Sequence, residues 1–153
     1  MNKSYWIILG FISCVFAYDM DYEDFSAYCP RPGELIKTED ATWVTKNDWR
    51  SFNPSFIDKV TIFLGAQWQG EKIGQLLCRY SNQSSINFPV TLQAPFLSKE
   101  PKGRGWKKDF VNFNTFNCYA LRIEDCPVVG VRKKELQIDT EESLKSFLQS
   151  IKQ

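Results

Sequence analysis

The sequence predicts a mainly β (α+β) fold: a small antiparallel sheet or sandwich stapled by two disulfides, with an amphipathic helix at the C-terminus. Three observations predict it. Apolar and polar residues alternate over residues 59–68, four cysteines lie outside the apolar N-terminal stretch, and the final segment carries an apolar stripe with helical spacing. These features divide the chain into residues 1–17, 18–28, 29–132 and 133–153.

The first segment, residues 1–17, is typical of a signal peptide. An apolar run over residues 5–17 follows one positive charge at Lys3. The run is about as long as a signal-peptide core and too short for the roughly 20 residues that span a bilayer. Cleavage near Ala17 is the first interpretation. The alternatives are a lipobox that ends at Cys14, which would then carry a lipid, and an uncleaved anchor.

Residues 18–28 are acidic and aromatic, and we expect a flexible or docked lead-in. The β-rich, disulfide-stabilised domain then covers residues 29–132. It begins with a turn-rich stretch at residues 29–33 and a short β-favouring run at residues 41–45.

The strongest strand signal in the chain covers residues 59–68. Its alternation places one set of side chains on the same face: Val60, Ile62, Leu64, Ala66 and Trp68. Residues 69–72 (QGEK) predict a hairpin turn into a second strand at residues 73–80, in which Gly74 suggests a bulge or a bend.

A third strand is expected at residues 88–93. Residues 94–109 contain two prolines and two glycines and predict the longest irregular connection. Another strand is expected within residues 111–123, interrupted near Asn117, and a short final strand at residues 128–131.

The C-terminal segment, residues 133–153, predicts a helical extension. Asp139 or Thr140 can cap the helix. An apolar stripe follows at positions i, i+3, i+4 and i+7, formed by Leu144, Phe147, Leu148 and Ile151. A helix of about 13 residues is marginal in isolation. We therefore expect this one to dock on its own sheet or on a partner protein.

The cysteines predict an oxidising compartment. An even number of them in an exported domain indicates two disulfides among Cys29, Cys78, Cys118 and Cys126. Four cysteines allow three pairings, and spacing alone does not choose between them. We favour Cys118–Cys126 with Cys29–Cys78, because the first pair is close along the chain. A structural role is expected for all four.

Charge and composition argue against several functions. Removal of residues 1–17 takes away Lys3 alone, so 19 basic residues become 18 and balance the 18 acidic ones. This balance does not favour nucleic-acid binding. The chain contains no histidine, so the usual general base and metal ligand are missing. We expect no enzyme activity, no cofactor and no metal site.

A basic loop at residues 99–108 is the first candidate for contact with a partner. Its candidate binding residues are Lys102, Arg104, Trp106, Lys107 and Lys108. Long loops are often functional, and Trp and Arg are favoured at binding hot spots. The alternative is a solvated loop with Trp106 tucked into the core.

The other candidate surfaces are the apolar stripe of the C-terminal helix, exposed tryptophans and a free strand edge. Tryptophans on a sheet could stack on a sugar, or they could form the core. A free strand edge could recruit another strand and form a homodimer.

Several motifs together resemble one family of exported proteins. They are residues 28–32 (YCPRP), 63–68 (FLGAQW), 74–80 (GQLLCRY), 88–92 (FPVTL) and 124–127 (EDCP), with Trp43 and Trp49 between them. This set is similar to the EirA family, which is associated with the Dot/Icm type IV secretion system of intracellular bacterial pathogens. The resemblance covers roughly residues 28–130 and brings no catalytic residues.

The resemblance implies a periplasmic protein, associated with the inner membrane peripherally or through a lipid, whose partners are components of the secretion apparatus or cell envelope. The expected function is that of a non-enzymatic accessory or structural protein. It would support effector translocation, and thereby intracellular replication and virulence, through protein–protein contacts. The alternatives are a periplasmic module that binds a glycan or small ligand, and a small protein inhibitor.

Overall fold

The computed structural model describes residues 22–84 and 88–133. Within them the fold is mainly β, as the sequence predicts, and the ordered helices are two short 3-10 turns, η1 (Pro32–Glu34) and η2 (Ile123–Asp125). The expected C-terminal amphipathic helix lies outside the described residues, and so does the expected signal peptide.

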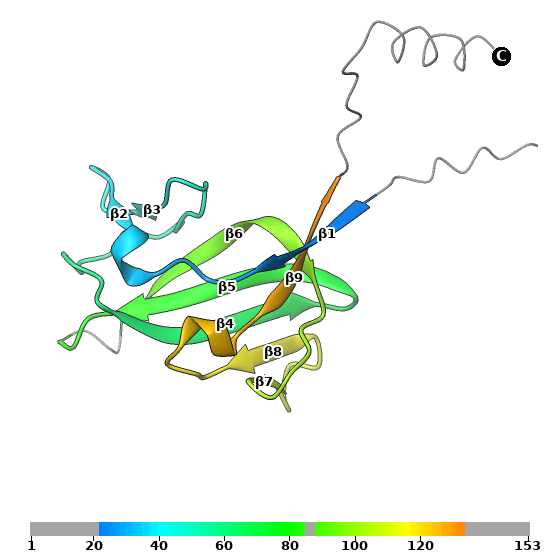
Figure 1. The fold of residues 1–153 in the computed structure, drawn as a ribbon. Helices are drawn as coiled ribbons and strands as arrows, with labels where there is room; N and C mark the ends of the chain where they lie inside the picture. The colour runs from blue at the N-terminus through cyan, green and yellow to red at the C-terminus, as the bar shows by residue number, and fades with distance from the viewer. Residues whose placement is uncertain (1–21, 85–87, 134–153) are drawn as a thin grey trace, which may run out of the picture.

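Seven antiparallel strands form the main sheet (Figure 1). They are β1 (Tyr22–Ala27), β4 (Ile62–Gly70), β5 (Ile73–Ser81), β6 (Val90–Lys99), β7 (Trp106–Lys108), β8 (Thr115–Cys118) and β9 (Val128–Lys133). Their order is β1-β9-β6-β5-β4-β8-β7. A separate two-stranded ribbon joins β2 (Ile36–Lys37) to β3 (Trp43–Val44).

The predicted β4–β5 hairpin is present, but its inward face differs from the simple alternation. Phe63 pairs with Tyr80 and Gly65 with Arg79, so Leu64 is an extra residue at a bulge. A bulge reverses the side-chain phase of a strand. Phe63 is therefore buried, with 4% of its surface exposed, whereas Leu64 is only half-buried. The prediction that Leu64 shares a face with Ala66 was wrong at this point.

Strand β6 is longer than expected, because it continues through Pro95 to Lys99. The pairing with β5 shifts between Gln75 and Leu77, and Pro95 lies within this irregularity. The Gln75 side-chain amide also donates to the Ala94 carbonyl at 2.9 Å. Only residues 100–105 remain as the connection to β7, so the predicted irregular stretch over residues 94–109 was wrong for most of its length.

The acidic segment before Cys29 contains β1, which pairs with β9 along its whole length. Two ion pairs accompany this pairing. Glu23 accepts from Arg132 at 3.0 Å, and Asp24 pairs with Lys99 at the end of β6. The start of β1 and the end of β9 therefore lie together beside the end of β6, at one end of the sheet (Figure 1).

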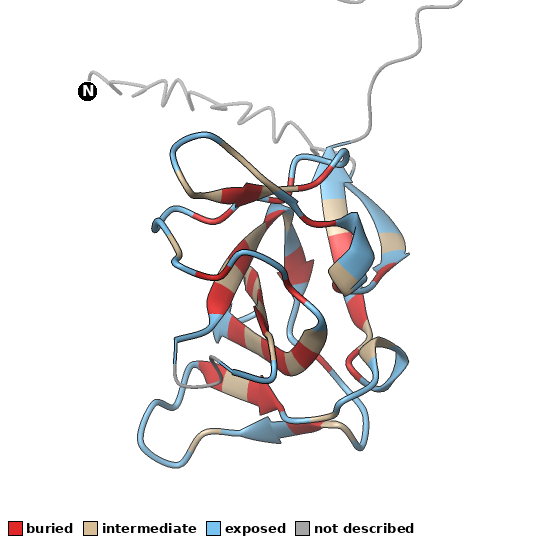
Figure 2. Ribbon diagram, turned by 90° about the vertical axis from the view of Figure 1, so that its left-hand side faces the viewer, coloured by how far each residue is buried: buried red, intermediate tan, exposed pale blue. Residues whose placement is uncertain are grey.

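The core lies on the inner face of the sheet (Figure 2). Trp68, Leu76, Cys78, Tyr80 and Leu92 form its centre and are completely buried. Two polar groups in this core are satisfied. The Trp68 indole donates to the Ser98 hydroxyl at 3.1 Å, and the Tyr80 hydroxyl donates to the Pro30 carbonyl at 2.7 Å. Burial raises the pKa of the Tyr80 hydroxyl, so this group stays protonated.

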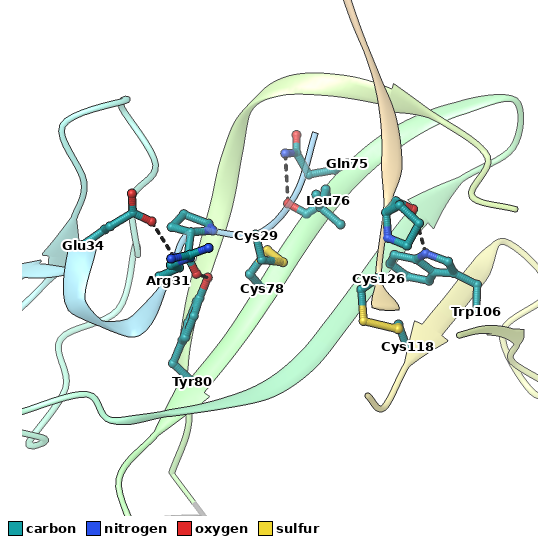
Figure 3. The surroundings of a disulfide bond; sticks show 12 residues. Cys29, Arg31, Glu34, Gln75, Leu76, Cys78, Tyr80, Trp106, Cys118 and Cys126 are labelled. Atoms are coloured by element: carbon teal, nitrogen blue, oxygen red, sulfur yellow. Dashed lines mark hydrogen bonds between the residues drawn. A yellow bond between two sulfur atoms is a disulfide. The ribbon is translucent and has the colours of Figure 1, made fainter. Parts of the chain in front are cut away.

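Both disulfides have the favoured pairing, Cys29–Cys78 and Cys118–Cys126 (Figure 3). The first joins the segment before η1 to β5. The second joins the end of β8 to the turn before β9. Since β9 lies next to one edge of the sheet and β8 next to the other, the second disulfide holds the sheet in a curl.

Candidate partner-binding surface

The structure separates the candidates of the basic loop into two groups. Lys102 and Arg104 are exposed in the connection between β6 and β7, and Lys107 and Lys108 are exposed on β7. None of the four forms an ion pair with a described residue. We call these four side chains the basic edge, because β7 is the last strand on its side of the sheet within the described chain.

Trp106 does not belong to this surface. It is only 7% exposed, and its indole N–H donates to the Pro127 carbonyl at 2.9 Å (Figure 3). The side chain therefore ties β7 to the start of β9 and helps to close the curl. Trp106 is a structural residue, as the alternative interpretation held, and its proposed place in a binding hot spot was wrong.

The other tryptophans of the described chain are buried as well. Trp43, Trp49 and Trp68 belong to the core, and Trp68 and Trp49 make edge-to-face contacts with Phe116 and Phe96. The described residues therefore offer no exposed tryptophan on which a sugar could stack.

A second surface feature, which the sequence did not predict, adjoins the basic edge. The turn between β7 and β8 presents three apolar side chains to solvent: Phe110 at 96%, Val111 at 83% and Phe113 at 73% exposure. We call these three residues the apolar tip. The strand expected within residues 111–123 covers only Thr115–Cys118, so residues 111–114 form the turn instead of a strand that would have buried every other side chain. The signal that could have found the turn is the set of turn-forming residues around it, Asp109, Asn112 and Asn114.

The backbone of the turn is held by hydrogen bonds within the hairpin. One carboxylate oxygen of Asp109 accepts from the backbone N–H groups of Val111 and Asn112, at 2.8 and 2.9 Å. The other accepts from the Asn117 side chain at 3.1 Å. The backbone N–H of Asp109 donates to the Thr115 carbonyl at 2.8 Å. The turn is thus an ordered structure with its apolar side chains directed outward.

These bonds also change the acidity of the carboxyl group. Hydrogen bonds from the Asn112 and Val111 backbone, with a smaller one from the Asn117 side chain, hold the pKa of Asp109 below its usual value. Asp109 is therefore ionised at neutral pH, and its charge is directed at the N–H groups of the turn.

A hollow of about 530 Å³ lies between the turn and the outer face of β4. Its walls are the side chains of Gln67 and Gln69 and residues 111–115. The amides of the wall are already engaged, since Gln69 donates to Gln67 and Gln67 donates to Asn117, both at 2.9 Å. No charged side chain lines this hollow.

The remaining candidates lie elsewhere. The apolar stripe of Leu144, Phe147, Leu148 and Ile151 falls outside the described residues. In residues 22–84 and 88–133, acidic and cysteine side chains do not group in a way that could hold a metal ion. The same part of the chain holds no helix that is both long and apolar enough to cross a membrane.

Comparisons with known proteins give no relative. No protein-family model, no curated protein and no solved structure matches this chain.

Proposed function

We propose that this chain is a non-enzymatic accessory protein of the bacterial periplasm that acts by binding another protein of the cell envelope through its basic edge. The family resemblance suggests a type IV (Dot/Icm) secretion system as the assembly, and effector translocation as the process that it supports.

One observation carries the proposal: a disulfide-held scaffold displays four exposed cations on the edge strand β7 and the connection that leads into it, and none of them forms an ion pair with a described residue. Disulfides persist in oxidising compartments, which include the periplasm. Exposed cations that lack an internal partner add little to stability. They do steer association with a surface of opposite charge.

The basic edge predicts the chemistry of its partner. Lys107 and Lys108 lie on a short edge strand, and Lys102 and Arg104 lie on the connection that leads into it. We therefore expect an acidic protein surface as the partner. Mutation of peripheral charges mainly changes the association rate and its salt dependence.

The test is crosslinked affinity purification from membranes of the native bacterium. The variant Arg104→Glu/Lys107→Glu reverses two charges of the basic edge. The matched control Lys46→Glu/Lys59→Glu reverses two exposed lysines elsewhere on the domain. We expect the wild type and the control to recover the same envelope protein, and the test variant to recover several-fold less of it.

Two results would count against the proposal. One is the recovery of no envelope component with the wild type. The other is equal recovery and equal effector translocation with the charge-reversed variant, provided that its melting temperature is unchanged.

A further inference from the structure

Transfer of the apolar tip out of water would be favourable. Its three side chains, Phe110, Val111 and Phe113, are nearly fully exposed. Burial of a large apolar side chain is among the strongest favourable terms available to a protein surface. Three such groups lie within four residues of one turn, and a local cluster of large exposed apolar side chains is a feature of interaction sites.

Part of the backbone of the turn is already hydrogen-bonded within the protein. The N–H groups of Val111 and Asn112 bond to the Asp109 carboxylate, and the N–H of Thr115 bonds to the Asn112 carbonyl. The Asn114 carbonyl accepts from the N–H of Gly70 at 2.9 Å. Backbone groups without partners are expensive in hydrocarbon, so these bonds lower the cost of bringing the turn to the interface of a bilayer, where the remaining N–H groups can still bond to water and headgroups.

Two cations precede the apolar tip along the chain. Lys107 and Lys108 precede the turn, both are exposed, and neither has an acidic partner in the described chain. The acidic residue that follows β7, Asp109, directs its charge into the turn. A protruding apolar group backed by lysines matches the layered chemistry of a bilayer, in which anionic headgroups overlie hydrocarbon.

The tip lies at the end of the sheet where β1 begins. Gly70 contacts the tip, and Ile73, just beyond the β4–β5 turn, pairs with Lys99. Lys99 in turn forms an ion pair with Asp24, near the start of β1 (Figure 1). Strand β1 thus begins at the same end of the sheet as the tip.

From these observations we infer that the apolar tip inserts into the surface of an anionic bilayer, with Lys107 and Lys108 at the headgroups. The tip projects from a hairpin. A projection of this kind can enter a lipid surface, whereas protein partners usually bind a flat face. Insertion would place Lys107 and Lys108 against the membrane and leave Lys102 and Arg104, in the connection before β7, for the protein partner of the basic edge. It does not depend on which protein the basic edge binds.

The test is flotation of the protein, purified from the envelope with the N-terminus that it carries there, on vesicles of phosphatidylcholine with and without phosphatidylglycerol. The test variant is Phe110→Ser/Phe113→Ser. The matched control is Phe56→Ser, which removes an equally exposed phenylalanine from the segment between β3 and β4. Because all three proteins share one N-terminus, any difference between them reports on the tip.

We expect the test variant to partition at least about ten-fold more weakly than the wild type and the control. Lys107→Glu/Lys108→Glu should weaken binding to phosphatidylglycerol vesicles alone. A second readout places an indole at the tip with Phe113→Trp. Its emission should shift to the blue on anionic vesicles and be quenched by lipids brominated near the headgroup, while Phe56→Trp should show neither effect.

Three outcomes would overturn the inference. They are equal flotation of the test variant and the wild type, an equal loss in the Phe56→Ser control, and no flotation of the wild type. Normal flotation combined with loss of the crosslinked envelope protein in the test variant would assign the tip to a protein partner instead.

Discussion

At the scale of single residues, Asp109 organises the turn that displays the apolar tip. Its carboxylate accepts three hydrogen bonds, which lower its pKa in the folded protein. A lowered folded-state pKa means that ionised Asp109 stabilises the fold above the unfolded pKa, near 3.8, and that this contribution is lost as the pH falls through the folded value.

Replacement of Asp109 by Asn should therefore have an effect that depends on pH. We expect wild type to melt at a higher temperature than Asp109→Asn at neutral pH, and the difference to shrink below about pH 4. Thermal unfolding of both proteins between neutral and strongly acidic pH measures this. A difference that stays constant into the acid range would mean that the charge of Asp109 does not hold the turn.

Trp106 illustrates how one side chain can be read in two ways. Its position among cations suggested a binding residue, but its indole is buried against Pro127. Trp106→Phe keeps most of the apolar volume and leaves the Pro127 carbonyl without this donor. We expect a loss of about 1–3 kcal/mol in the free energy of unfolding, measured in urea. Its neighbour gives the control, since Lys107→Ala should change stability by less than about 0.5 kcal/mol.

At the scale of elements, the connection between β6 and β7 must approach η2 closely. A Cβ added at Gly105 would lie 2.1 Å from the Asp125 carbonyl oxygen and 3.1 Å from the sulfur of Cys118. Only glycine fits there without displacement of the backbone, so the approach of β7 to the turn before β9 depends on this residue.

Gly105→Ala should accordingly destabilise the domain by about 2 kcal/mol or more. The control is Gly33→Ala, because a Cβ at Gly33 would meet nothing within 4 Å. Urea unfolding of both variants separates the two cases. A Gly105→Ala protein as stable as the Gly33→Ala protein would show that the curl is not closed at this point.

The sequence predicted some of these elements well and others poorly, for physical reasons. Alternation and turn residues marked the β4–β5 hairpin, because local spacing determines it. The bulge at Leu64 reversed the inward face of β4, and the irregularity at Pro95 let β6 continue through a proline. Both are pairing events with neighbouring strands, and local periodicity does not record them.

The same limit explains why only part of the candidate surface was predicted. The cations of the basic edge could be recognised from charge alone. Turn-forming residues could have marked the turn of the apolar tip, but not the exposure of its side chains, which depends on the hydrogen bonds that Asp109 makes across the turn. Burial of Trp106 depends in turn on the curl, which brings segments distant in the sequence together.

At the scale of the whole molecule, two disulfides hold the curled sheet. Cys118–Cys126 closes a short loop with a sequence separation of 8, and Cys29–Cys78 a long one with a separation of 49. The loop-entropy account assigns about 2.6 kcal/mol to the first and about 4 kcal/mol to the second. These values are comparable with the net stability of a small domain, about 5–15 kcal/mol.

Replacement of each pair by serine should therefore destabilise the protein unequally. Cys29→Ser/Cys78→Ser should cost more free energy of unfolding than Cys118→Ser/Cys126→Ser, and urea unfolding measures both. Because the shorter disulfide lies closest to β7, its loss should nevertheless do more to reduce vesicle flotation and partner recovery. A larger loss of stability in Cys118→Ser/Cys126→Ser than in Cys29→Ser/Cys78→Ser would show that the length of the loop closed in the unfolded state does not determine how much each disulfide stabilises the protein.

The whole account depends on export of the protein, because the two disulfides must form before the scaffold can hold the basic edge and the apolar tip in place. The most direct measurement is alkylation of free thiols in rapidly acid-quenched native cells, followed by mass spectrometry of the protein. The account predicts that Cys29, Cys78, Cys118 and Cys126 are unmodified unless a reductant is added first. A protein with all four cysteines alkylated, recovered with an uncleaved N-terminus from the cell interior, would contradict it.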